Sequence, residues 1–290
     1  MGVSAQVEPV EQESRESRAV PGTQPEGIRD ERAAAGYVRE MFSRIAPRYD
    51  LLNHLLSFSL DRVWRRRTAR RFRDILQRAD ARVLDLCCGT GDLTLALWRE
   101  GEKSKALPQR TQRNAEENGG QPVESESCAG MIAGSDFAHP MLVRAREKSA
   151  ALALRYFEGD AMQLPVADAS FDLVTCAFGF RNLANYEAGL REIWRVLRPG
   201  GEVGILEFAA PRSRFIRGMY RLYFTQIVPR LGGAVSGSRA AYAYLPVSVE
   251  KFPEREELHA KMREIGFADA RAELWTFGTV ALHRARRVSP

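Results

Sequence analysis

Three aspartates, each placed where a hydrophobic run ends, carry the most chemistry in this sequence. Asp85 lies near the end of the first run, and Asp136 and Asp160 follow the next two. A carboxylate accepts strong hydrogen bonds from sugar hydroxyls and amino groups. Parallel strands end at one edge of an open α/β sheet, and ligands bind at that edge. The three aspartates therefore predict a site for a nucleotide-type ligand.

A tight turn made of Gly89, Thr90 and Gly91 follows the first run. Glycines allow a sharp turn and close approach of a ligand to the main chain, and the helix expected from Asp92 offers free N–H groups. A dinucleotide fingerprint would need glycine where this chain has Thr94, and no Gly-Lys-Ser/Thr follows, so a phosphate loop is excluded. An acid four residues before Gly-x-Gly resembles the first motif of S-adenosylmethionine-dependent methyltransferases.

The second and third aspartates fit an adenosyl ligand. Asp136 is placed to accept both ribose hydroxyls, and Asp160 with the backbone N–H of Ala161 is placed to bind the adenine. Local roles are the alternatives: a helix cap for Asp136 and a turn for Asp160. Asp136 lies 51 positions after Asp85, but 29 of these belong to a polar segment, residues 102–130. The remaining 22 match the spacing of about 20 residues typical of a ribose-binding acid.

The composition indicates a soluble globular chain of 290 residues, 44% hydrophobic and 28% charged, with a net charge of +6. We find no apolar run long enough to span a membrane and no signal-peptide core, so we expect a cytoplasmic protein. The four cysteines lack zinc-like spacing, so we expect reduced thiols and no metal site. The net charge is too small to identify a partner.

The remaining elements alternate as in a doubly wound parallel sheet. We expect a disordered N-terminal tail over residues 1–32, then one domain over residues 33–290, with a flexible insertion at 102–130 and a lid at 211–250. The expected strands are 82–87, 131–134, 154–158, 171–177, 202–208, 270–276 and 279–285. The expected helices are 33–45, 60–77, 92–99, 140–151, 186–197 and 254–265.

Further segments carry a family resemblance. Residues 49–57 (YDLLNHLLS) with Trp64, residues 178–183 (FGFRNL) and residues 195–201 (RVLRPGG) are similar to motifs of the ubiquinone/menaquinone biosynthesis C-methyltransferases. The resemblance covers roughly residues 36–285 except the 102–130 insertion. The chain departs from that pattern with Leu52, Asp61, Arg198 and Ala209. Of these departures, Asp61 replaces a frequent histidine and puts any acid–base role of such a histidine in doubt.

The resemblance implies an α/β class I S-adenosylmethionine-dependent methyltransferase with a seven-stranded doubly wound sheet, N-terminal helices and a helical lid. It implies S-adenosylmethionine as the methyl donor and C-methylation of a prenylated hydroquinone, with demethylmenaquinol favoured over a benzoquinol. Arg181 is the candidate for stabilising a phenolate-like oxygen, because its guanidinium stays charged. Tyr49 and Asp50 are candidates for proton handling or for closing the donor pocket. A salt bridge that caps the next helix is the alternative for Arg181, and helix capping for the other two.

Two basic segments suggest where the prenyl chain of the substrate binds. Residues 215–224 mix aromatic side chains with arginines, and residues 62–73 contain seven arginines. They predict a lid and peripheral contact with an anionic membrane; a core-packed helix and a solvated basic face are the alternatives. Other apolar acceptors and a non-catalytic scaffold for quinone synthesis are competing functions. A nucleic-acid substrate is disfavoured, and the sequence leaves a homodimer open.

Overall fold

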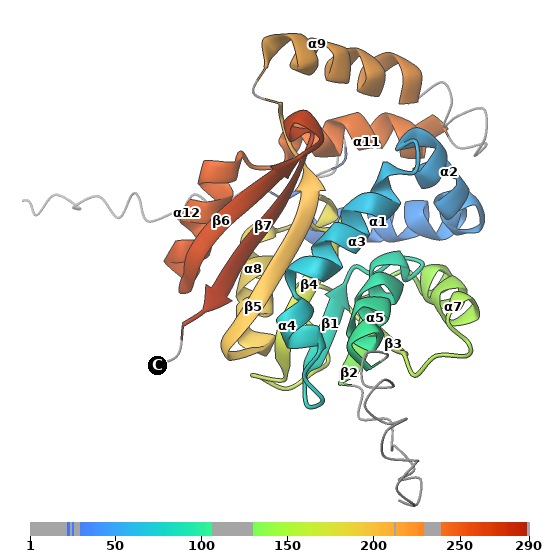
Figure 1. Cartoon of the computed structure of the whole chain (residues 1–290). Coiled ribbons are helices and arrows are strands. Elements are labelled where there is room, and N and C mark those ends of the chain that lie inside the picture. The colour runs from blue at the N-terminus through green and yellow to red at the C-terminus, as the bar shows by residue number, and fades with distance from the viewer. Residues whose placement is uncertain are drawn as a thin grey trace, which may run out of the picture.

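The computed structural model describes residues 22, 23, 25, 30–105, 130–211, 213–228 and 239–288. Most of the tail expected over residues 1–32 and most of the insertion expected over residues 102–130 therefore lie outside the described residues. Within them, a seven-stranded sheet has the order β3-β2-β1-β4-β5-β7-β6 (Figure 1). Strands β1 to β5 run parallel, and β7 is antiparallel to both of its neighbours. The strands are β1 (Arg82–Leu86), β2 (Met131–Asp136), β3 (Arg155–Glu158), β4 (Phe171–Ala177), β5 (Leu197–Phe208), β6 (Phe267–Trp275) and β7 (Val280–Arg287).

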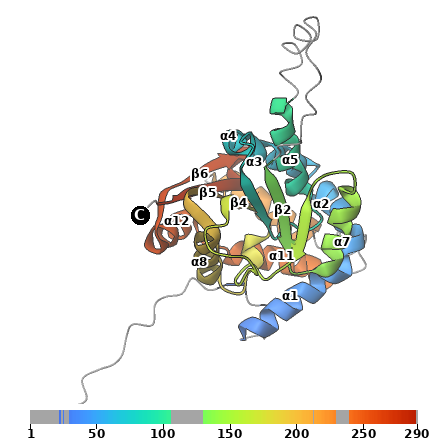
Figure 2. The same ribbon diagram turned by 90° about the horizontal axis from the view of Figure 1, so that it is seen from below.

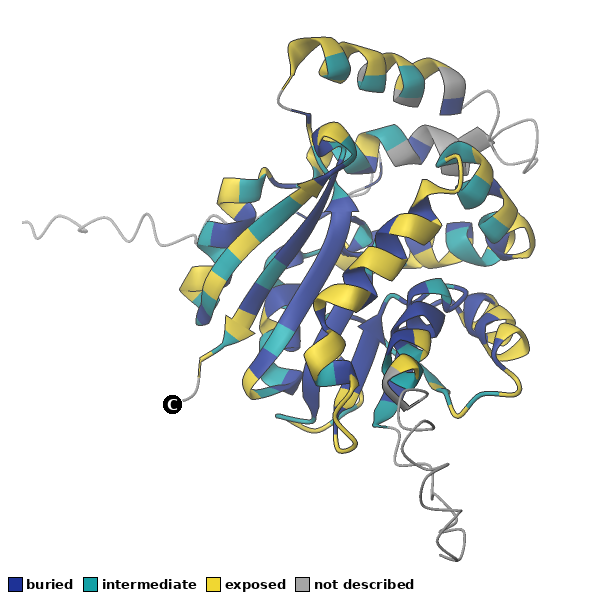
Figure 3. Cartoon of the chain, in the orientation of Figure 1, coloured by how far each residue is buried: buried dark blue, intermediate teal, exposed yellow. Residues whose placement is uncertain are grey.

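The central strands are buried on both faces because helices cover both sides of the sheet (Figures 2 and 3). Tyr186 and Ile193 of α8 pack with Leu258 of α12 against one face. Phe72 and Leu97, from the other helical layer, pack against the opposite face. The first layer consists of α8 (Tyr186–Val196) and α12 (Arg255–Ile265), and the second of α3 (Leu60–Arg71), α4 (Arg73–Leu76) and α5 (Asp92–Lys105).

A further group of helices lies beyond the carboxyl ends of the parallel strands (Figure 1). Val38, Leu52 and Met141 share a small core with Val228 and Tyr244, so the N-terminal helices pack with the lid segment. This group thus roofs the sheet edge at which the aspartates were expected. It consists of α1 (Glu31–Ile45), α2 (Tyr49–Leu56), α9 (Arg214–Leu222) and α11 (Arg239–Lys251), with α7 (His139–Lys148) beside them.

The seven strands and their order agree with the predicted fold, but several boundaries differ. The single helix expected over residues 60–77 breaks at Phe72, whose backbone leaves the helical region at φ −114°. The helix that starts at Asp92 continues to Lys105, four residues into the segment predicted as an insertion. Strand β5 begins at Leu197, so the Pro-Gly-Gly turn is a bulge within the strand.

Candidate active site

The glycine turn after β1 is backbone that only glycine adopts readily. Gly89 and Gly91 have φ of +55° and +81°. A side chain at Gly91 would also place its Cβ 2.9 Å from the hydroxyl of Tyr156. The turn therefore needs glycine for conformation and, at Gly91, for space, and it leads into the N-terminus of α5.

Asp85, the first of the three aspartates, lies in β1 just before this turn. Its side chain is fully buried, and its two oxygens accept hydrogen bonds from Thr94 Oγ1 at 2.6 Å and Thr175 Oγ1 at 3.1 Å. Burial raises the pKa of Asp85 to about 7. Its carboxyl lines a small polar pocket together with Thr90. Asp85 thus lines the small pocket beside the turn and does not line the larger cavity next to it.

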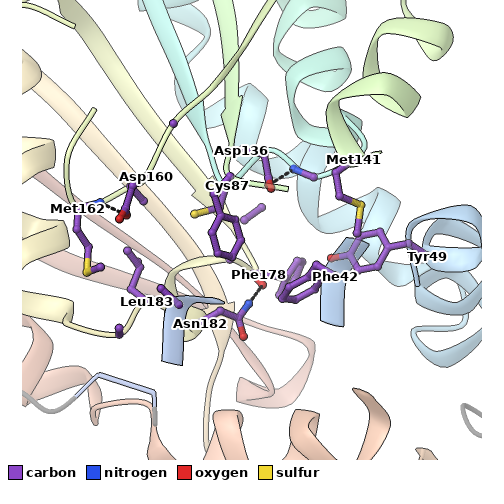
Figure 4. A pocket seen from close by; sticks show the side chains of 18 residues that line it. Phe42, Tyr49, Cys87, Asp136, Met141, Asp160, Met162, Phe178, Asn182 and Leu183 are labelled. Carbon is purple, nitrogen blue, oxygen red and sulfur yellow. Dashed lines mark hydrogen bonds between the residues drawn. The ribbon is translucent and has the colours of Figure 1, made fainter. Parts of the chain in front are cut away.

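The larger cavity has about 670 Å³ of space including its opening (Figure 4). Four of the predicted donor-binding residues line it, Gly89, Asp136, Asp160 and Ala161, whereas Thr90 and Gly91 do not. Asp136 accepts hydrogen bonds from the backbone N–H groups of Gly89 and Ala138, both at 2.9 Å. Burial raises the pKa of Asp136 to about 6, against the lowering effect of these bonds. Asp160 accepts the N–H of Met162 at 2.9 Å. The lining consists of Ala35, Phe42, Tyr49, Cys87, Gly89, Asp136, Phe137, Met141, Gly159, Asp160, Ala161, Met162, Ala177, Phe178, Gly179, Asn182, Leu183 and Ala184.

Of the two local alternatives weighed for these aspartates, the turn at Asp160 is present and the helix cap at Asp136 is not. Asp160 closes a turn, whereas the N-cap of α7 is Ala138 without a side-chain bond, and Asp136 accepts the N–H of Ala138 just before the helix. Each carboxylate oxygen has more than one lone pair, so these bonds leave acceptor capacity toward the cavity. The two roles are therefore compatible, with the backbone bonds fixing the carboxylates in place.

A second cavity of about 960 Å³ lies next to the first, between the sheet edge and the lid. Tyr49 and Phe178 line both cavities, so these two side chains form the wall between them. Its surface is mainly aromatic and aliphatic, as expected for an apolar acceptor. The lining consists of Tyr49, Asn53, Leu56, Ser57, Phe58, Leu60, Asp61, Trp64, Arg65, Phe178, Arg181, Phe208, Tyr220, Tyr223, Val228, Thr276 and Thr279.

Tyr49, at the start of α2, is the one of these two wall residues that has a titratable group. Burial raises the pKa of its phenol, while a hydrogen bond with Asn53 and the charges of Arg181 and Arg65 act in the opposite direction. Its ring packs edge-on against Phe42, with centroids 5.9 Å apart. Tyr49 is therefore placed between the two cavities as a largely neutral phenol.

Asp50 is held outside both cavities by a network that ties α2 to the glycine turn. Its carboxylate accepts hydrogen bonds from Lys148 Nζ at 2.8 Å and from Thr90 Oγ1. Lys148 also contacts Asp92 at 2.5 Å. Of the two roles predicted for Asp50, this position favours closing the donor pocket over proton handling. The hydroxyl of Thr90 likewise belongs to this hydrogen-bond network, since it donates to Asp50.

Arg181 lies in the second cavity and is buried against Glu207 of β5. Its Nη1 donates to the two oxygens of Glu207 at 3.3 and 3.1 Å, and also to the carbonyl oxygen of Phe178. Burial disfavours its charge, but Glu207 outweighs this and raises the pKa of Arg181. The salt bridge weighed as an alternative therefore exists, with a strand residue rather than the next helix as its partner.

Glu207 and Arg65 are site residues that the sequence did not single out. Glu207 lies 26 residues from its partner Arg181, so no local sequence pattern connects the two. Arg65 is one of many arginines in α3, but its side chain is buried where most of the others are exposed. It pairs with Asp61, the residue that departs from the family pattern.

Among the described residues, one group of side chains has the spacing of a metal site: His54, Asp61 and Asp92. Arg65 Nη1 bonds to Asp61 and lies 4.0 Å from Asp92. The guanidinium thus supplies positive charge between the two carboxylates, where a metal ion would have to bind.

Comparisons with known proteins identify the relatives of this chain. A family model described as the ubiE/COQ5 methyltransferase family matches residues 28–287. The chain is 46% identical over 260 residues to a demethylmenaquinone methyltransferase of Deinococcus radiodurans, covering 89% of this chain and 95% of the relative. It is also 46% identical over 246 residues to the Thermus thermophilus protein of that name, covering 84% and 98%. A solved SAM-dependent methyltransferase from Aquifex aeolicus shares the fold with a TM-score of 0.50 at 16% identity, covering 76% of this chain and 89% of that one.

Proposed function

This chain belongs to the ubiE/COQ5 methyltransferase family, and on that premise we propose that it methylates a ring carbon of demethylmenaquinol, with S-adenosylmethionine as the donor. The family and its named relatives make it an S-adenosylmethionine-dependent methyltransferase. The demethylmenaquinol acceptor is inferred from those relatives and from the apolar second cavity.

The first cavity has the donor set that an adenosyl group requires. Asp136 offers carboxylate oxygens for ribose hydroxyls, and Asp160 with Ala161 offers an acceptor and a backbone N–H for the adenine. The small pocket at the glycine turn adjoins this cavity through Tyr49, Cys87, Gly89 and Ala177. It opens toward the N-terminus of α5, which suits a carboxylate. These residues fit the nucleoside end and the amino-acid end of the donor.

The reaction needs a nucleophilic ring carbon in line with the donor's methyl group. The bound donor supplies an electrophilic methyl group on a sulfonium. The ring carbon becomes strongly nucleophilic when the neighbouring hydroxyl loses its proton. Arg181 is fixed by Glu207 in the acceptor cavity, where its positive charge stabilises that oxygen as it becomes anionic. The Arg181–Glu207 pair therefore lowers the barrier without leaving an unpaired buried charge.

The wall shared by the two cavities carries this proposal. Tyr49 and Phe178 bound both spaces, so a donor in one cavity and an aromatic ring in the other meet at these two side chains. Such positioning of two reactants contributes much of a transferase's rate enhancement. The proposed transfer takes place at this wall.

Incubation with isotopically labelled donor and a panel of reduced demethylated naphthoquinols and benzoquinols tests the proposal. We expect label in the ring of a demethylnaphthoquinol and much slower labelling of benzoquinols. Faster labelling of a benzoquinol would assign the other quinone pathway. An absence of transfer to every quinol, with intact donor binding measured by calorimetry, would overturn the proposed reaction.

We also propose peripheral contact with an anionic membrane, from which a prenylated acceptor would enter. Phe215, Met219 and Leu222 form an exposed apolar stripe on α9, and the exposed face of α3 is rich in arginine. No helix among the described residues has the length and hydropathy needed to cross a bilayer.

Co-sedimentation with vesicles tests this contact. We expect pelleting with anionic vesicles and little with neutral ones, because both charge and apolar insertion are needed. The variant Phe215→Ser/Met219→Ser is expected to lose pelleting, whereas Val143→Ser, at an exposed valine of α7, is expected to keep it. Equal, negligible pelleting of the wild type in both lipids would contradict the proposal.

A further inference from the structure

The acceptor cavity contains two buried arginines, and each is anchored by its own buried carboxylate. Arg181 pairs with Glu207, and Arg65 pairs with Asp61. Among the described residues that line the cavity, the charged ones are Asp61, Arg65 and Arg181. The function proposed above uses only the first of these two pairs, so Arg65 needs an explanation of its own.

Asp61 is built to keep Arg65 in one position. Its Oδ1 accepts the hydroxyl of Ser57 at 2.7 Å, and its Oδ2 accepts from His54 Nδ1 at 2.9 Å and from Arg65. Arg62 Nε donates to the other ring nitrogen of His54 at 3.3 Å, which leaves the ring proton on Nδ1. Asp61 is thus held as an anion by three side chains, with Arg65 as its charged partner.

The two guanidinium groups stand over neighbouring aromatic rings. Arg65 Cζ lies 5.6 Å from the centroid of Phe178, and Arg181 Cζ lies 5.3 Å from that of Phe208. The two ring centroids are 4.9 Å apart. The two cations therefore lie against one pair of contacting aromatic rings, and both line the same cavity.

Both guanidinium groups keep donors for a ligand. Among the described residues, Arg65 and Arg181 make their side-chain hydrogen bonds through Nη1 alone. The Nε of Arg181 is buried and has no hydrogen-bond partner among those residues. A buried N–H without an acceptor is costly, so Arg181 Nε calls for an oxygen atom from the acceptor, and the remaining N–H groups of Arg65 are available for a second oxygen.

We propose that Arg65 binds the second oxygen of a 1,4-dihydroxy aromatic ring while Arg181 binds the first, so that the cavity selects a para-diol over a monophenol. This inference rests on the proposed function, because it takes the acceptor to be a quinol. A ring with only one hydroxyl would leave the remaining donors of Arg65 facing a buried apolar ring edge. Sites built to bind a substrate oxygen reject analogues that lack it.

Equilibrium binding tests the selection independently of turnover. The probes are reduced 1,4-dihydroxynaphthalene with a short isoprenyl chain and 1-naphthol with the same chain, titrated anaerobically in the presence of S-adenosylhomocysteine. The readout is tryptophan fluorescence, since Trp64 lines the cavity. For the wild type we expect the diol to bind about 10- to 100-fold more tightly than the monophenol.

Variants assign this preference to Arg65. Arg65→Lys keeps the charge but loses the planar fork, and we expect the preference to fall to about twofold or less. Arg67→Lys is the matched control, because Arg67 lies on the same helix but is exposed over the ring of Trp275, and it is expected to keep the full preference. The double variant Asp61→Asn/Arg65→Gln removes the pair without leaving a lone buried charge and is expected to behave as Arg65→Lys does.

The outcomes separate this inference from the proposed reaction. Equal binding of both probes by the wild type, or an unchanged preference in folded Arg65→Lys and the double variant, would overturn it. Tight, selective diol binding without methyl transfer to any quinol would support the arginine pair and refute the proposed reaction. Methyl transfer to quinols without any preference for the diol in binding would support the proposed reaction and refute the selection by the arginine pair.

Discussion

Arg181 is the residue whose charge the proposed chemistry uses most directly. Glu207 anchors it in the acceptor cavity, so its effect belongs to the transition state rather than to donor binding. We expect Arg181→Gln/Glu207→Gln, which removes both charges together, to lower kcat by about 10²- to 10³-fold and to leave the Kd for S-adenosylmethionine nearly unchanged. Rapid-quench kinetics and calorimetry measure the two quantities, and a wild-type kcat in a folded variant would remove Arg181 from the mechanism.

Asp136 gives donor binding a defined pH dependence. Burial raises its pKa to about 6, and only the anion accepts hydrogen bonds from both ribose hydroxyls. We therefore expect the Kd for the donor to be constant above that pH and to rise about tenfold for each unit below it. Asp136→Asn is expected to bind weakly without this dependence.

Asp85 provides the control for that titration, since burial raises its pKa to about 7. Its oxygens accept from Thr94 and Thr175, and its carboxyl lines the small pocket proposed for the amino-acid end of the donor rather than the cavity proposed for the ribose. Asp85→Asn is therefore expected to retain the pH dependence of donor binding with a midpoint near 6. Loss of the midpoint near 6 in Asp85→Asn would instead mean that Asp85, and not Asp136, causes the pH dependence of donor binding.

The positions of the aspartates that end strands could be predicted from sequence. Asp136 and Asp160 follow buried runs, and parallel strands bring such residues to one edge by necessity. The ion pairs in the acceptor cavity could not be predicted from sequence. No local sequence pattern indicates which strand Arg181 faces or how α3 is rotated about its axis on the sheet. Arg65 differs from its arginine neighbours only by that rotation.

At the scale of elements, α2 connects the glycine turn with the wall between the two cavities. It carries Tyr49 into the shared wall and is tied to the glycine turn through Asp50 and Lys148. Lys148→Met breaks this tie, and a half-exposed ion pair contributes about 0.2–1 kcal/mol. We expect the donor's dissociation rate to rise about two- to fivefold in stopped-flow measurements.

A matched variant shows whether that effect is local. Arg191→Met removes an exposed pair with Glu187 on α8, away from the cavities, and is expected to leave the dissociation rate unchanged. Equal rates for Lys148→Met and the wild type would mean that α2 is held by its packing alone. The helix boundaries themselves were less predictable, since the break at Phe72 has no glycine or proline to mark it.

For the whole molecule, a buried histidine pair links stability to pH. His259 Nε2 and His283 Nδ1 lie 3.1 Å apart between α12 and β7. Burial, then the neighbouring His259 and Arg255, lowers the pKa of His283 to about 3. A lowered folded-state pKa means that the unfolded chain binds more protons, so stability is full above about pH 6.5 and falls as the pH drops toward 3.

Urea unfolding between pH 7.5 and 5 measures this term. We expect His283 to contribute a slope of up to about 1.4 kcal/mol per pH unit, and His283→Leu to remove it. Asp85 and Asp136, whose pKa values are raised, contribute with the opposite sign. The difference between variant and wild type therefore isolates the histidine, and parallel pH profiles for the two proteins would contradict its role.

The partition made of Tyr49 and Phe178 has a consequence for the order of events. In the proposed reaction each ligand rests against one side of the same two rings, so occupancy of either chamber restrains the surface that the other ligand must meet. Binding of donor and acceptor is then thermodynamically coupled, and by linkage each changes the other's affinity by an equal factor. The catalytic cycle accordingly passes through a ternary complex. Product left in one chamber changes the affinity of the other chamber for its ligand.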